Sequence, residues 1–190
     1  MDVTIVEMLP HILPLEDEEA AAEVAKAYTK RGVKLLVGHK VEAVEATKTG
    51  VKVTVSAAGE TKVLEAEQAL VAIGFRPNSK GRGLEEVGVK LSERGAVEID
   101  ERMATNVPGI WAIGDVTAKL MLAHVGSAMG IVCAEHIAGQ PTVSLEYEMM
   151  PRATYCSPQV ASFGMTEAQA KERGYTVKIG RFPFQPNGKA

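Results

Sequence analysis

Gly114 and Asp115 stand directly after an apolar run, residues 109–113, which we expect to form a buried strand. Folds of the α/β class place their ligands at the carboxyl edge of such a sheet. A glycine there lets a ligand approach the backbone, and an aspartate accepts hydrogen bonds from sugar-type hydroxyls. An aspartate at this point can also do no more than shape a turn. The pair alone leaves both interpretations open, and the complete string 105–115 favours the ligand.

A helix predicted from about Met121 to Ala138 follows this string, and Gly139 and Pro141 end it. The first N–H groups of a helix have no partner within the helix. We therefore expect them to face the same crevice as Asp115 and to favour negative charge or a carbonyl acceptor.

Glu7 ends a short β-branched run, residues 3–7. A helix is expected from about Asp17 to Arg31, because its acids lie in the first turn and its bases in the last. With a second apolar strand at 33–37, this order predicts a right-handed parallel βαβ unit. An acid that ends the strand after a dinucleotide-binding turn typically holds the ribose hydroxyls of the dinucleotide. Position alone favours a solvated carboxylate instead.

Further elements follow from alternation and from turn residues. An antiparallel meander is predicted from three short alternating segments, 41–45, 51–56 and 62–65. Apolar residues predict another strand at 69–73, which Gly74 ends. The last part of the chain predicts strands and one helix, at 152–156, 160–163, 166–173 (the helix) and 175–182.

Several classes of protein receive no support. The net charge is −3, and no basic cluster carries interleaved aromatics, so we expect no nucleic-acid partner. No apolar run approaches the roughly 20 residues needed to span a bilayer, and the start has no signal pattern, so a cytoplasmic protein without a membrane partner is expected.

The two cysteines, Cys133 and Cys156, have neither metal-knuckle nor redox-pair spacing, and Cys133 is expected to be a buried core thiol. The histidines are scattered, so no metal is assigned.

The string 105–115 resembles the second FAD fingerprint of the pyridine nucleotide–disulfide oxidoreductases. The segment Met-Leu-Ala-His that follows resembles the corresponding segment of the dihydrolipoamide dehydrogenases within that family. The resemblance implies that Asp115 binds the ribityl chain of FAD and that the backbone of the segment lies at the pyrimidine edge of the flavin. The segment consists of Met121, Leu122, Ala123 and His124. We expect the His124 side chain to pack there without proton chemistry.

Residues 3–37 resemble the second strand, second helix and third strand of the family's NAD domain. By this resemblance Glu7 holds the adenosine ribose, Val41 contacts the adenine region, and Gly74 lies beneath the NAD. A core residue is the plainer interpretation of Val41, and a turn glycine that of Gly74. No arginine occurs in residues 8–15 to bind a 2′-phosphate, so NAD is favoured over NADP.

The fold class implied is α/β, a partial Rossmann-like FAD/NAD(P)-binding domain followed by the start of an α+β dimerisation domain. We expect the C-terminal part of the NAD-binding domain at 1–74, the returning segment of the FAD-binding domain at 75–145, and the N-terminal part of the dimerisation domain at 146–190. The sequence contains neither a GxGxxG motif nor a CxxxxC redox pair, so no catalytic residue is assigned and a truncated chain is expected. The strands at 3–7 and 69–73 would then have unpaired edges.

The activity implied is oxidation of dihydrolipoamide and reduction of NAD⁺ through a disulfide and FAD, with the isolated chain expected to be inactive. The expected partners are a second copy, as a homodimer, and the lipoyl domains of 2-oxo acid dehydrogenase complexes. Mercuric reductase, soluble transhydrogenase and glutathione reductase share the Gly-Asp motif and stay open as alternatives. A nucleotide-binding module without turnover and an inert dimerisation fragment are alternatives of another class.

Overall fold

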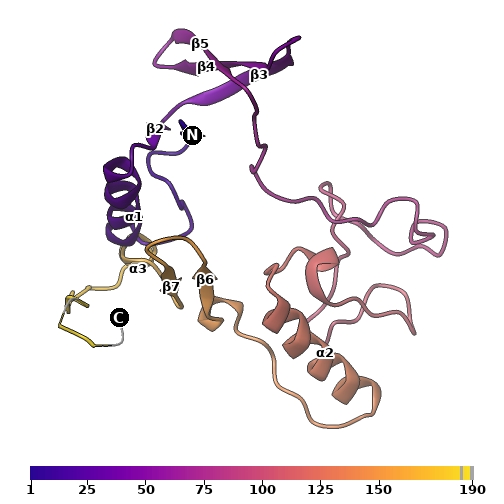
Figure 1. Cartoon of the computed structure of the whole chain (residues 1–190). Coiled ribbons are helices and arrows are strands. Elements are labelled where there is room, and N and C mark those ends of the chain that lie inside the picture. The colour runs from indigo at the N-terminus through magenta and orange to yellow at the C-terminus, as the bar shows by residue number, and fades with distance from the viewer. Residues whose placement is uncertain (185, 189–190) are drawn as a thin grey trace. The chain divides into compact units, whose positions relative to one another are not determined.

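The computed structural model describes residues 1–184 and 186–188, which form two compact units (Figure 1). Unit 1 consists of Met1–Ala69 and Ala153–Ala190. Unit 2 consists of Leu70–Arg152. Each unit is described by itself.

Unit 1 begins with a strand–helix–strand element. Strand β1 (Thr4–Glu7) pairs in parallel with β2 (Lys34–Val37), and α1 (Glu18–Lys30) connects them. Asp17 caps α1, acidic residues occupy its first turn, and Ala21 and Val24 are its buried residues. The predicted parallel pair and its connecting helix are therefore confirmed.

An antiparallel meander follows β2. It consists of β3 (Lys40–Ala46), β4 (Val51–Ala57) and β5 (Glu60–Ala66), with β4 in the centre. Val55 in β4 is fully buried, and the register between β3 and β4 shifts between Val41 and Ala43. The meander is as the alternating sequence predicts.

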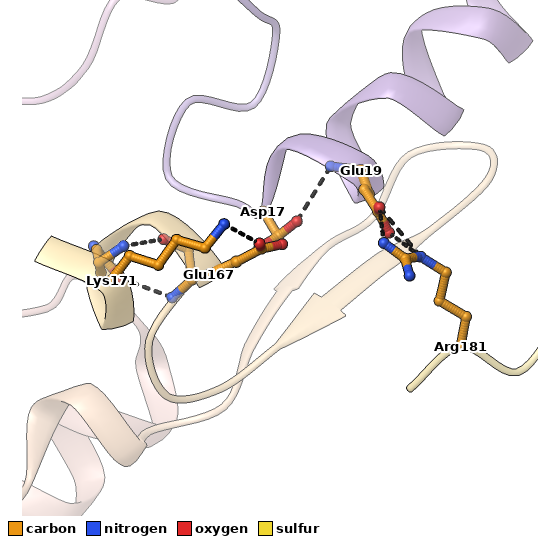
Figure 2. A network of polar contacts seen from close by, with 7 residues as sticks. Asp17, Glu19, Glu167, Lys171 and Arg181 are labelled. Carbon is orange, nitrogen blue, oxygen red and sulfur yellow. Dashed lines mark hydrogen bonds and ion pairs between the residues drawn. The ribbon is translucent and has the colours of Figure 1, made fainter. Parts of the chain in front are cut away.

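The C-terminal part of unit 1 is tied to α1 by polar contacts (Figure 2). Helix α3 (Glu167–Glu172) lies beyond two short paired strands, β6 (Arg152–Thr154) and β7 (Val160–Ser162). The amide of Glu167 donates to Asp17, and the guanidinium of Arg181 pairs with Glu19.

Unit 2 is built on α2 (Ala123–Ile137). A 3₁₀ turn, η1 (Gly114–Thr117), packs on this helix, and a second one, η2 (Tyr147–Met149), follows it in the chain. The core of the unit consists of buried apolar side chains, namely Met103, Val125, Met129 and Val132.

Three predicted strands are wrong. Residues 69–73, 109–113 and 175–182 form no strand, and the second range makes only an isolated bridge between Trp111 and Ala104. Leu70 and Ile73 are 92% and 93% exposed. A strand exists only where a neighbour supplies backbone hydrogen bonds, and no strand within the described residues lies beside these segments.

The predicted helix at 121–138 begins two residues late, because Leu122 keeps an extended backbone with φ −133°. Among the described residues, no helix combines the length and the apolar character that crossing a membrane requires.

Candidate functional site

Asp115 lies in η1 with an exposed carboxylate. The turn is closed by other groups, since the hydroxyl of Thr117 donates to the carbonyl of Gly114 at 2.8 Å and the amide of Ala118 donates to the Asp115 carbonyl at 3.0 Å. Within the described residues, the Asp115 carboxylate itself has no hydrogen-bond partner. The side chain is therefore free to accept hydrogen bonds from a ligand.

Gly114 fixes this turn against α2. Its φ of +73° is a left-handed conformation that favours glycine, and its amide donates to the Met129 sulfur at 3.4 Å. A Cβ on Gly126 would lie 3.5 Å from the Gly114 Cα, so the two glycine backbones pack closely. Asp115 is therefore positioned by the helix and not by a strand, which corrects the expectation for residues 109–113.

The N-terminus of α2 presents free donors. Leu122 is the cap residue, and no side chain in the described part of the chain caps the helix. Its carbonyl accepts from Val125 and Gly126, both at 3.0 Å, whereas the amides of Ala123 and His124 have no acceptor among the described residues. These two N–H groups lie at the positive end of the helix dipole and suit a carbonyl or an anion.

His124 makes a contact that its local sequence does not predict. Its Nε2 lies 2.9 Å from the carbonyl oxygen of Pro151, which is 27 residues further along the chain. Because a carbonyl oxygen can only accept, Nε2 must carry a proton, and in the neutral ring Nδ1 is then the acceptor. No periodic pattern relates the two residues, so only the tertiary structure shows the bond.

Glu7 ends β1 and is half-buried. Its Oε1 accepts the amide of Leu9 at 2.8 Å, and its backbone carbonyl accepts the amide of His39 at 3.0 Å. Its second carboxylate oxygen has no partner in the described part of the chain. One acceptor at the carboxyl end of a parallel strand therefore stays available, where α/β folds bind dinucleotides.

Val41 and Gly74 do not lie in the same unit. Val41 belongs to unit 1, stands at the register shift of β3 and is 40% exposed, so it is not a core residue. Gly74 belongs to unit 2, where its φ is +127° and a Cβ would have no atom within 4 Å. The structure therefore places Glu7 and Val41 in one unit and Gly74 in the other, and it brings Asp115 and residues 121–124 together in unit 2.

A cavity of about 470 Å³ in unit 2 is distinct from these residues. Its walls include Asn78, Arg82, Trp111 and Ile113, and neither Asp115 nor residues 121–124 line it. The candidate site is thus the exposed ledge formed by η1 and the start of α2.

The two cysteines are both free. Burial raises the pKa of the Cys133 thiol, which makes it a poorer nucleophile. The Cys156 sulfur lies 2.8 Å from the Pro158 carbonyl, to which it donates. No group of three or more potential metal ligands occurs within the described residues.

These features define a dinucleotide-binding type of α/β protein. The sequence matches the family described as "Pyridine nucleotide-disulphide oxidoreductase" over residues 1–130 and the dimerisation domain of that family over residues 150–190. The chain therefore belongs to the pyridine nucleotide-disulphide oxidoreductase family, whose members bind FAD and use NAD. The resemblance and the fold class expected from the sequence are confirmed.

Similar proteins cover the whole chain. A dihydrolipoyl dehydrogenase of Corynebacterium glutamicum is 54% identical over 100% of this chain and 42% of its own length, and one of Mycobacterium leprae is 53% identical over 100% of this chain and 41% of its own. The chain thus spans about two fifths of the curated relatives that it matches.

Solved structures agree with this relationship. LpdA from Mycobacterium tuberculosis has a TM-score of 0.87 at 30% identity, covering 100% of this chain and 40% of that one. The HOCl-induced flavoprotein disulfide reductase RclA from Escherichia coli has a TM-score of 0.85 at 27% identity, covering 100% of this chain and 43% of that one.

Proposed function

We propose that this chain is the part of a dihydrolipoyl dehydrogenase that holds the ribityl and pyrimidine side of FAD. The observation that supports this most is that unit 2 holds a carboxylate and two amides for which no hydrogen-bond partner occurs among the described residues. The Asp115 carboxylate suits the ribityl hydroxyls, and the amides of Ala123 and His124 suit a carbonyl of the flavin ring. Met121 and Leu122 complete the ledge, and the bound FAD supplies the electron transfer.

For NAD we propose a half-site in unit 1. The free oxygen of Glu7 accepts from a ribose hydroxyl, and the exposed Val41 offers an apolar surface to the adenine. Gly74 lies in unit 2 and is proposed separately, as a glycine whose backbone a dinucleotide can approach, because a side chain there would meet only open space. The division into segments 1–74, 75–145 and 146–190 stays part of this proposal.

The reaction proposed for the whole protein is oxidation of dihydrolipoamide with reduction of NAD⁺. The curated relatives are named for this activity. A homodimer is supported by the match to the dimerisation domain, and lipoyl domains of 2-oxo acid dehydrogenase complexes are the proposed partners in the cytoplasm. The spacing of the two cysteines fits no CxxxxC redox pair, so we assign binding groups and no catalytic residue to this chain.

A second candidate is another flavoprotein disulfide reductase, which the likeness to RclA favours. Both candidates use the same FAD ledge. Lipoamide is the discriminating substrate when the chain is extended to the length of its relatives, because only the dihydrolipoyl dehydrogenase turns it over rapidly. The chain of 190 residues is expected to show no lipoamide turnover of its own.

The direct test is a titration of the 190-residue chain with FAD, followed by flavin fluorescence. Asp115→Ala is expected to weaken binding by roughly tenfold or more, because a charged acceptor is lost. Glu93→Ala is the matched control, since Glu93 is another exposed carboxylate of unit 2 without a partner among the described residues. Equal affinities for the two variants, or no FAD binding by the parent chain, would contradict the proposed site.

A further inference from the structure

The first turn of α2 is held from outside the helix. Leu122 supplies no side-chain cap, and the His124 ring reaches the carbonyl of Pro151 at 2.9 Å instead. Pro151 directly follows a segment that packs on the core of unit 2 through three side chains, namely Leu145, Tyr147 and Met150. The carbonyl therefore has a fixed position relative to the helix.

This contact crosses the boundary between two family matches. The dimerisation domain match begins at residue 150, yet unit 2 extends to Arg152, so the first residues of that domain belong structurally to the unit that carries the FAD ledge. The His124–Pro151 bond is one polar link between them, beside the amide of Met150, which donates to the carbonyl of Tyr147 at 3.2 Å.

We propose that His124 is a positioning residue for the flavin site, and that the Pro151 carbonyl fixes it through Nε2–H. This inference rests on the proposed FAD site. The bond restrains the N-terminus of α2, so the N–H groups of Ala123 and His124, which have no acceptor among the described residues, keep a fixed orientation toward the ligand side. Binding a flavin carbonyl then requires no further ordering of the turn, and less conformational entropy is lost.

Only Nε2 of the His124 ring donates to the Pro151 carbonyl, so a variant that keeps a donor at that position should keep the effect. A glutamine places an N–H donor at about the reach of Nε2, whereas a leucine fills similar space without a donor. His124→Gln is therefore the rescuing variant and His124→Leu the disruptive one. His39 is the matched control, because its Nδ1 lies 2.7 Å from the Val37 carbonyl in unit 1, which requires the opposite tautomer.

The first experiment needs no cofactor. Nitrogen-15 NMR of the 190-residue chain is expected to show the Nε2–H tautomer at His124 and the Nδ1–H tautomer at His39. Amide exchange at Val125 and Gly126, which both donate to Leu122, reports fraying of the turn. We expect His124→Leu to accelerate this exchange roughly three- to tenfold, because one neutral hydrogen bond is lost. His124→Gln and His39→Leu are expected to leave the exchange rate unchanged.

The second experiment is the FAD titration of the same variants. The expected result is a roughly three- to tenfold weaker affinity for His124→Leu, restored in His124→Gln. If FAD binds and His124→Leu binds as tightly as the parent, the positioning role is wrong and the proposed FAD site stands. If no variant binds FAD, the proposed site is wrong for this chain, and the exchange data alone decide whether His124 orders the turn. An Nδ1–H tautomer at His124 overturns the inference in either case.

Discussion

The carboxylate of Asp17 binds the first amide of α3, that of Glu167, 150 residues further along the chain (Figure 2). Its Oδ2 accepts this N–H at 2.9 Å, while its Oδ1 accepts the amide of Glu19 at 3.2 Å as the cap of α1. One side chain thus satisfies the N-termini of two helices, which places α3 against the start of α1 within unit 1.

Asp17→Asn and Asp17→Ala are expected to separate these two bonds. An asparagine has one acceptor oxygen, so it can cap α1, a position that it favours, but turns an NH₂ toward Glu167. We expect faster amide exchange at Glu167 in both variants and at Glu19 in the alanine variant alone. The alanine variant should lose about 1–2 kcal/mol of unfolding free energy, and the asparagine variant about half of that. Asp2→Asn, at an exposed position, is the control.

An asparagine variant with an unchanged exchange rate at Glu167 would show that the bond across 150 residues does not order α3. Urea unfolding and exchange measured on the same samples distinguish this outcome from a general loss of stability.

The Glu19–Arg181 ion pair predicts a dependence on pH (Figure 2). The hydrogen bond from Arg181, with its charge, holds the pKa of Glu19 below the ordinary value of 4.5. A group with a lowered folded-state pKa stabilises the contact fully above about pH 4.5 and loses this effect as the pH falls through the lowered value. We expect the Nε–H resonance of Arg181 to move toward the free-arginine position as the pH falls below about 4.5.

In Glu19→Gln this movement should disappear and the resonance should lie near its low-pH position at all pH values. Glu23→Gln is the control, because Glu23 pairs with Lys26 within α1 at 3.8 Å and does not contact Arg181. Added salt should shift the parent chain in the same direction as acid, since both partners are exposed. A resonance that is insensitive to both would show that the pair contributes nothing in solution.

Thr166 caps α3 with a reciprocal pair of bonds. Its hydroxyl accepts the Gln169 amide at 3.2 Å, and the Gln169 side chain accepts the Thr166 amide at 2.9 Å. Thr166→Ala is expected to cost about 1 kcal/mol and to accelerate exchange of the Gln169 amide, whereas Thr166→Ser keeps the acceptor. Because Asp17 holds a neighbouring amide of the same turn, Thr166→Ala and Asp17→Asn should be non-additive, as a double-mutant cycle can measure.

The helices show what the sequence could predict. The bounds of α1 and α3 follow from Asp17, from Thr166 and from the order of charges, because capping and dipole effects act within one turn. The meander is predictable for the same reason, since alternation is a local signal. The apolar run at 69–73 looks identical whether or not a neighbouring strand exists, so its failure to form a strand could not be read from the run itself.

The candidate site also consists of residues that the sequence predicts and residues that it does not. Asp115 and residues 121–124 are found from a contiguous fingerprint, and the structure places them together in unit 2. The support that they receive comes from Met129, Gly126 and Pro151, which no motif marks. Spacing along the chain identifies the groups that face a ligand, whereas the groups behind them depend on tertiary packing.

Gly114 and Gly126 should respond to alanine with opposite signs. Gly114 has a φ of +73°, so Gly114→Ala is expected to cost about 1–2 kcal/mol and to weaken FAD binding by displacing Asp115. Gly126 lies inside α2, where a Cβ would be 3.5 Å from the Gly114 Cα, an ordinary contact. Gly126→Ala should therefore stabilise the helix by about 0.5–1 kcal/mol.

Thermal unfolding and FAD titration of the two variants test this contrast. The expected pattern is a lower Tm and weaker binding for Gly114→Ala, against a higher Tm and unchanged binding for Gly126→Ala. A loss of stability in Gly126→Ala would mean that η1 packs more tightly on α2 than the 3.5 Å approach implies, because the added methyl would then have to displace the turn. In that case FAD affinity should fall together with Tm, since Asp115 moves with the turn.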